Sequence, residues 1–93
     1  MEITIQSLHF TARPSLDEFV REKVTALEKF NGKILSADVY LKLDKAVEGN
    51  KVCELKIALP GEKLVAKKQD SSFEKATVSA VEAMKQQLES RRN

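Results

Sequence analysis

The spacing of hydrophobic residues along this chain alternates between a period of two and a helical period. Polar and apolar residues alternate over residues 2–6, where Ile3 and Ile5 are β-branched, and this pattern predicts a first strand. Residues 7–12 are expected to form a loop, in which Phe10 folds back to cover one end of the core.

A helical stripe of apolar residues follows over residues 14–30. Ser15 and Glu18 have the spacing of a capping box, in which each side chain bonds a free backbone N–H group of the first turn. The helix is expected to end at Asn31 and Gly32, because glycine readily adopts the left-handed conformation found at many helix ends. The predicted buried residues of this helix are Leu16, Phe19, Val20, Val24, Leu27 and Phe30.

The period returns to two after residue 34, which predicts three further strands. They are expected at residues 34–44 and 53–59 and, as a shorter strand, at 64–66, ending at Lys67 and Lys68. The core-facing residues of the first two of these strands are predicted to be Ala37, Val39, Leu41, Leu43, Cys53, Leu55, Ile57 and Leu59.

Short turns separate these strands, and a second helix follows them. The turns are expected at residues 45–50 and at Pro60-Gly61. Ser71 and Glu74 again have capping-box spacing, which places the helix start near Asp70. Its predicted buried residues are Phe73, Thr77, Ala80, Val81, Met84 and Leu88, and the polar end at 89–93 is expected to fray.

The element order is therefore β-α-β-β-β-α over one domain, residues 1–93. The last three strands should form an antiparallel meander, and the first should pair in parallel with a neighbour, because a helix connects it to the next strand. Each helix has one apolar stripe and each strand one apolar face. We expect an α+β fold of two layers, in which a four-stranded mixed sheet carries both helices on one face and leaves the other face to solvent.

Composition excludes several classes of protein. The chain has 16 Lys+Arg and 14 Asp+Glu, a net charge of +2, so total charge does not identify a nucleic-acid binder. One cysteine cannot form an internal disulfide, and one cysteine with one histidine argues against a structural zinc site. No apolar run has the length of a membrane span, and no signal peptide is evident, so a soluble cytoplasmic protein is expected.

The residues that carry catalytic chemistry elsewhere have simpler explanations here. Cys53 falls on the inward face of a strand, where a buried, inert thiol is expected. His9 could act as a general base or stack on RNA. A loop histidine without such a role is favoured, because it has no partner His or Cys and no carboxylate lies within six residues. Two acidic pairs, Asp17-Glu18 and Asp38/Asp44, could in principle supply an acid and a base. The first pair is better explained by the positive end of the helix dipole, and the second by its place on the solvent-facing side of a strand.

No Gly-rich phosphate-binding motif occurs either. We therefore expect no enzyme and no cofactor.

The excess positive charge lies in residues 31–69, which hold eight lysines and five acidic residues. Lys63, Lys67 and Lys68 approach the start of the second helix, where free backbone N–H groups suit phosphate binding. A mixed, solubilising surface is the alternative, and on charge alone it is favoured. Lys23 flanks the buried stripe of the first helix, and Lys85, Arg91 and Arg92 flank that of the second, so they could form a basic patch on the outer helix surface. Favourable placement near a helix C-terminus is the alternative, and it accounts fully for Arg91 and Arg92.

The sequence resembles the ribosome hibernation-promoting factor family, also called ribosome-associated inhibitor or sigma-modulation proteins. The resemblance rests on the opening Met-Glu-Ile-Thr-Ile, the helix at 16–30, the strand segment Val39-Tyr40-Leu41 and the helix end Ala-Met-Lys-Gln-Gln-Leu at 83–88. It extends over almost the whole chain. The family's fold is akin to a double-stranded RNA-binding domain and has the element order derived above.

The resemblance implies a partner and a site. Family members bind the small ribosomal subunit and its 16S rRNA in the channel for mRNA and tRNA, and so inhibit translation and protect inactive ribosomes in stressed or stationary bacteria. The resemblance implies that the contact surface is a basic patch shared by the two helices. Lys23 matches a family lysine, and Lys29 lies where the family's base is less regular. Lys85 lies close to a basic run of the second helix, and Arg91 and Arg92 fall in its basic tail. No membrane or DNA partner is expected. The predicted RNA-binding residues are Lys23, Lys29, Lys85, Arg91, Arg92, Lys67, Lys68 and Lys75.

This chain also departs from the family. Members often have bases at the positions of Ala26, Ala83, Gln86 and Ser90, and fewer phosphate contacts should weaken binding and its salt dependence. The chain resembles a short form without a dimerisation domain, so ribosome pairing would need a separate factor. The alternative is a protein-interaction module that kept the fold and lost strong ribosome binding.

Overall fold

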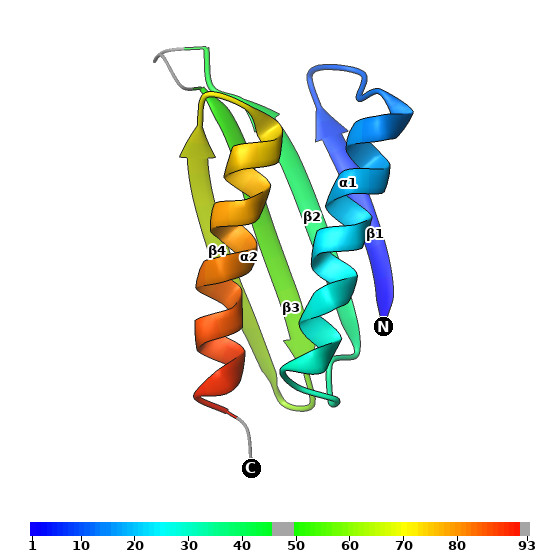
Figure 1. The fold of residues 1–93 in the computed structure, drawn as a ribbon, viewed down its shortest axis with the longest axis vertical. Helices are drawn as coiled ribbons and strands as arrows, with labels where there is room; N and C mark the ends of the chain where they lie inside the picture. Colours follow the sequence, from blue (N-terminus) through cyan, green and yellow to red (C-terminus); the bar gives the residue numbers. More distant parts are fainter. Residues whose placement is uncertain (46–49, 92–93) are drawn as a thin grey trace.

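The chain folds into a four-stranded sheet with two helices packed on one of its faces, as Figure 1 shows. Residues 1–45 and 50–91 are described by a computed structural model. The elements are β1 (Glu2–Leu8), α1 (Pro14–Thr25), the 3-10 helix η1 (Ala26–Lys29), β2 (Ser36–Leu43), β3 (Lys51–Leu59), β4 (Glu62–Asp70) and α2 (Phe73–Glu89). The predicted order and two-layer α+β class are confirmed. Most of the turn predicted at 45–50, residues 46–49, lies outside the described residues.

The sheet is mixed, with strand order β1-β2-β3-β4. β1 runs parallel to β2, with Ile5 beside Val39, because α1 carries the chain back to the end of the sheet at which β1 begins. β2, β3 and β4 form the predicted antiparallel meander. Pro60 and Gly61 turn the chain between β3 and β4, and the φ of 76° at Gly61 is one that glycine adopts without strain.

The core lies between the helices and the sheet. The inward residues of β2 and β3 are buried as the alternation predicts, except that Leu43 is only partly buried. On the helices, Phe19, Phe30 and Val81 are also only partly buried, while Ala76, outside the predicted stripe, is fully buried.

The ends of the first helix differ from the prediction. Arg13 is the N-cap residue, Pro14 occupies the first turn, and no side chain caps this end, so the proposed capping box at Ser15 is wrong. Proline is favourable here because the backbone N–H groups of the first turn have no carbonyl partner within the helix, so no hydrogen bond is lost. The helix tightens into η1, and the Asn31 side-chain oxygen then accepts a hydrogen bond from the Lys33 backbone N–H (2.9 Å). Gly32 does not take the predicted left-handed conformation.

The fourth strand is longer than predicted, and the second helix begins one residue later. β4 does not end at Lys67 and Lys68; it pairs with the whole of β3 as far as Asp70. An edge strand tolerates lysines, because their long side chains reach solvent from either face. The N-cap of α2 is Ser72, not Ser71: its hydroxyl accepts a hydrogen bond from the Lys75 backbone N–H (3.1 Å).

The loop after β1 closes one end of the core, as predicted. Phe10 stacks on Phe73, with ring centroids 4.6 Å apart and planes 7° from parallel. β1 extends to Leu8, beyond the predicted end at residue 6, because its pairing with β2 continues that far. His9 then turns the chain with a φ of 70°, a left-handed conformation in which histidine is more common than most residues.

Candidate nucleic-acid interface

Two of the predicted RNA-binding lysines lie beside aromatic rings of the helical layer. The Lys23 Nζ atom is 5.4 Å from the ring centroid of Phe19, one turn earlier on α1. The Lys85 Nζ atom is 5.0 Å from the ring centroid of Phe30, the residue that follows η1. An ammonium group over an aromatic face is attracted by the electrons of the ring, so both lysines are positioned before any ligand arrives.

The Lys85 contact connects the two helical segments. Lys85 belongs to α2, whereas Phe30 ends the first helical segment, so the pair spans the helical layer. Lys29 is exposed at the end of η1, next to Phe30. Lys23, Lys29 and Lys85 therefore all belong to the helical layer, which the resemblance assigns to rRNA; we call these three residues the helix-face lysines.

A shallow depression of about 690 Å³ follows the outer side of α2. Phe19 of α1 lines it together with Val78, Ala83 and Gln86 of α2. Ala83 and Gln86 are two of the positions at which the family often has bases, and both reach this surface. The structure therefore accommodates a base at either position, and this chain lacks it.

The start of α2 is less basic than the sequence suggests. Lys68 and Lys75 lie at this end of the same depression. Lys63 pairs with Ala58 at the other end of β4, so the prediction that it approaches the start of α2 is wrong. Three carboxylates, those of Asp70, Glu74 and Glu82, line it as well. The charges of this depression therefore do not favour a phosphate, and Lys68 and Lys75 are weaker candidates than the helix-face lysines.

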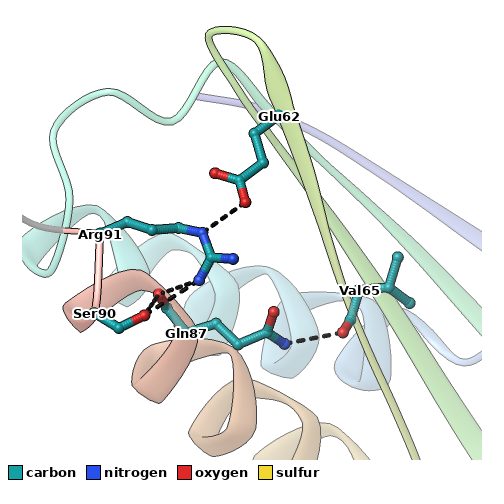
Figure 2. Close-up of polar contacts among 5 residues, drawn as sticks. All are labelled: Glu62, Val65, Gln87, Ser90 and Arg91. Carbon is teal, nitrogen blue, oxygen red and sulfur yellow. Dashed lines mark hydrogen bonds and ion pairs between the residues drawn. The ribbon is translucent and has the colours of Figure 1, made fainter.

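Arg91 is held by the protein itself, as Figure 2 shows. Its Nε atom donates to the Glu62 carboxylate at 2.8 Å, and its Nη1 atom donates to the Gln87 carbonyl at 3.0 Å and to the Ser90 hydroxyl at 3.2 Å. The Gln87 side chain in turn donates to the Val65 carbonyl of β4 at 2.9 Å. These bonds fasten the end of α2 to β4, and Glu62 offsets the charge of Arg91. Arg92 lies outside the described residues.

Lys67 lies on the opposite face of the sheet from the helices. It neighbours Glu54 of β3, which in turn pairs with Tyr40 of β2. Two further lysines approach the Tyr40 ring: Lys56 Nζ is 5.3 Å and Lys42 Nζ 5.9 Å from its centroid. The seven predicted bases that the structure describes thus do not form one surface.

Lys42 and Lys56, the two lysines at the Tyr40 ring, are not among the residues predicted to bind RNA, although the sequence contains a signal for them. The period of two in β2 and β3 already directs Tyr40, Lys42 and Lys56 away from the core. What the sequence does not provide is the register that brings the three side chains together.

The remaining candidate groups show no reactive arrangement. Burial raises the pKa of the Cys53 thiol to about 11, against a smaller opposing effect of the Thr77 hydroxyl, so the thiol stays protonated at neutral pH. Within residues 1–45 and 50–91, no three His, Cys, Asp or Glu side chains gather as a metal site would require. In the same part of the chain, no helix is long and apolar enough to cross a membrane.

The fold and the helix-face lysines define a small two-layer α+β domain with cationic groups positioned on its helical layer. Residues 3–93 match the family model described as "Sigma 54 modulation protein / S30EA ribosomal protein", and the chain belongs to this family. The chain is also similar to a ribosome hibernation promoting factor of Acinetobacter guillouiae, with 26% identity over 99% of this chain and 88% of that protein.

Two solved structures share the fold. The N-terminal domain of Thermus thermophilus Protein Y has a TM-score of 0.86 and 22% identity, covering 99% of this chain and 100% of that one. A ribosomal subunit interface protein of Coxiella burnetii has a TM-score of 0.87 and 18% identity, covering 98% and 97%. The predicted fold class and family are confirmed.

Proposed function

We propose that this protein is a ribosome hibernation factor that binds the 16S rRNA of the small ribosomal subunit in the mRNA and tRNA channel. There it inhibits translation and stabilises inactive ribosomes in the cytoplasm under stress or in stationary phase. Family membership over residues 3–93 is the observation that carries this proposal. The similarity to a ribosome hibernation promoting factor, which covers nearly the whole chain, supports it.

The helix-face lysines are the groups we propose to contact rRNA. Lys23 and Lys85 are each positioned by an aromatic ring, so binding need not order two fully mobile side chains. Lysine ammonium groups bind phosphate oxygens without reading base sequence, which suits recognition of a folded RNA by charge and shape. No catalytic step is part of this function.

The charge of this face sets the expected strength of binding. Ala26, Ala83, Gln86 and Ser90 are all exposed or partly exposed, so the positive charges often found there in the family are simply missing. Fewer phosphate contacts give a weaker complex that depends less steeply on salt. A separate ribosome-pairing factor would supply additional contacts if paired ribosomes form.

The depression along α2 favours one alternative. Phe19 and Val78 give it apolar surface, and its acidic residues outnumber its lysines. A protein-interaction module of this fold, without strong ribosome binding, would use such a surface.

Co-sedimentation with separated ribosomal subunits at low and moderate salt distinguishes the two functions. The proposed factor sediments with the small subunit at low salt and not with the large subunit, and it inhibits translation in a cell-free system. If no protein sediments with the small subunit at low salt, the proposed function is wrong and the interaction module is favoured.

A further inference from the structure

The sheet face turned away from the helices carries a cluster of cationic side chains around one aromatic ring. Tyr40, Glu54 and Lys67 lie in one row across β2, β3 and β4, since Tyr40 pairs with Glu54 and Glu54 with Lys67. Neighbouring strands are about 4.8 Å apart, so the row places Tyr40 and Lys67 within roughly 10 Å. Lys56 projects from the adjacent row and reaches the ring of Tyr40.

The lysines of this cluster differ in whether a carboxylate of the protein forms an ion pair with them. Lys42 donates to the Glu54 carboxylate at 3.0 Å, and this bond, with the nearby charges of Lys42, Lys56 and Lys67, lowers the pKa of Glu54. Lys56 lies opposite Asp38 in the strand register. Within the described part of the chain, neither Lys56 nor Lys67 forms an ion pair with a carboxylate. The ammonium group of Lys56, at the Tyr40 ring, and that of Lys67, two strands away from Tyr40 in the same row, therefore remain available to an anionic ligand.

A depression of about 570 Å³ continues this cluster toward the end of the sheet. Its lining includes the almost fully buried Val52 and, among the described residues, the lysines Lys42, Lys45 and Lys67 and the carboxylate of Asp44. Lys42 is already paired with Glu54, so Lys45 and Lys67 supply the cationic groups of this lining. Ligand pockets of about 300–1,000 Å³ hold small organic molecules, so this one has room for a nucleotide. Lys42 and Lys67 belong to both the depression and the Tyr40 cluster, which makes the two a continuous surface.

We propose that this open sheet face is a second binding surface, and that its ligand is single-stranded RNA. Phosphates bind Lys56 and Lys67, one base stacks on Tyr40, and the next nucleotide enters the depression. Proteins that bind single strands combine a cationic track with aromatic rings in this way, because every base has a face that stacks. An acidic protein segment would form ion pairs with the lysines, but its carboxylates would not stack on the Tyr40 ring.

This surface is separate from the helix-face lysines, because the core of the protein lies between them. The inference therefore does not depend on the proposed function, and a free oligonucleotide can test it without ribosomes. A hibernation factor with this second surface could hold an RNA strand while its helices occupy the ribosome.

Fluorescence anisotropy with a labelled, unstructured oligouridylate provides the test. The double substitution Lys56→Gln/Lys67→Gln should make the dependence of log affinity on log salt shallower by about 1.4, the value for two lost contacts to a single strand. Tyr40→Leu should weaken binding roughly 5- to 150-fold, as the loss of one stacked base does elsewhere, while Tyr40→Phe should retain it.

A charge-matched control separates a site from general attraction. Arg13 and Lys33 are both exposed and belong to neither surface, so Arg13→Gln/Lys33→Gln removes the same charge and should leave oligonucleotide affinity nearly unchanged. Equal losses in the two double variants would overturn the proposal, as would no binding by the unmodified protein. Equally effective competition by polyglutamate, or unchanged affinity in Tyr40→Leu, would also overturn it.

Discussion

The Nζ atom of Lys85 lies 5.0 Å from the centre of the Phe30 ring, and this contact joins α2 to the end of the first helical segment. A lysine that the family resemblance assigns to RNA is thus positioned by a residue that also packs against the core. Phe30 therefore both packs against the core and contacts a lysine of the proposed interface.

The Lys85–Phe30 contact should be measurable as a coupling energy. In a double-mutant cycle of Lys85→Met and Phe30→Leu, urea unfolding should give a coupling of about 0.5–1 kcal/mol, the usual size of an exposed cation–π contact. The matched cycle replaces Lys29, which neighbours Phe30 in sequence and makes no ring contact, with methionine. A coupling of zero for Lys85, or the same value for Lys29, would show that the ring does not hold Lys85.

The start of α2 allows a direct test with two adjacent serines. Ser72 caps the helix, whereas the Ser71 hydroxyl, among the residues that the structure describes, bonds the Asp70 side chain alone. Ser72→Ala should therefore lower the free energy of unfolding by about 1 kcal/mol, and Ser71→Ala should change it little. Denaturation of the two variants under the same conditions checks this. A larger loss in Ser71→Ala would instead support the capping box that the sequence suggests.

The buried thiol should make stability fall at alkaline pH. Burial raises the pKa of Cys53 from 9.0 to about 11, so the folded protein keeps a proton that the unfolded chain loses. Between pH 9.0 and about pH 11, this group alone should lower the free energy of unfolding by about 1.4 kcal/mol per pH unit. Below pH 9 it should add no pH dependence.

Other groups titrate in the same range, so the measurement is a difference. Unfolding free energies of the unmodified protein and Cys53→Ala, taken as a function of pH, should diverge in slope only above about pH 9. Parallel curves would show that the Cys53 thiol is not held protonated by the fold.

Periodicity predicted the sheet well because each strand buries one face. The inward residues of β2 and β3, from Ala37 to Leu59, follow a strict alternation, and a slip by one residue would expose all of them. The order of elements also follows from the sequence, since short turns permit only antiparallel neighbours and a helix permits a parallel one.

Element ends were harder to predict, because they depend on competing local groups. Ser15 and Ser71 each have a glutamate at capping-box spacing, yet Pro14 sets the start of α1 and Ser72 caps α2. The end of β4 depends on its pairing with β3, which adds ladder bonds as far as Asp70. A sequence pattern does not show which residue caps each helix or how far two strands pair.

The candidate site was predicted in part. Helical spacing places Lys23 and Lys85 on the helical layer, but the Arg91–Glu62 pair joins residues 29 positions apart, which spacing cannot anticipate. The division of the lysines between two faces has a different origin. The predicted fourth strand ends at Lys67 and Lys68, and only because β4 continues to Asp70 do these adjacent residues project to opposite sides.

Our central claim is that the helix-face lysines bind the small ribosomal subunit. Its most direct test is the affinity of three proteins for purified small subunits over a series of salt concentrations: the unmodified chain, Lys23→Glu/Lys85→Glu, and the charge-matched Arg13→Glu/Lys33→Glu. We predict that the control binds like the unmodified protein. The Lys23→Glu/Lys85→Glu variant should bind at least about tenfold more weakly, with a salt dependence shallower by roughly 1.4–1.8 in log units. Unchanged affinity and salt dependence in that variant would contradict the claim.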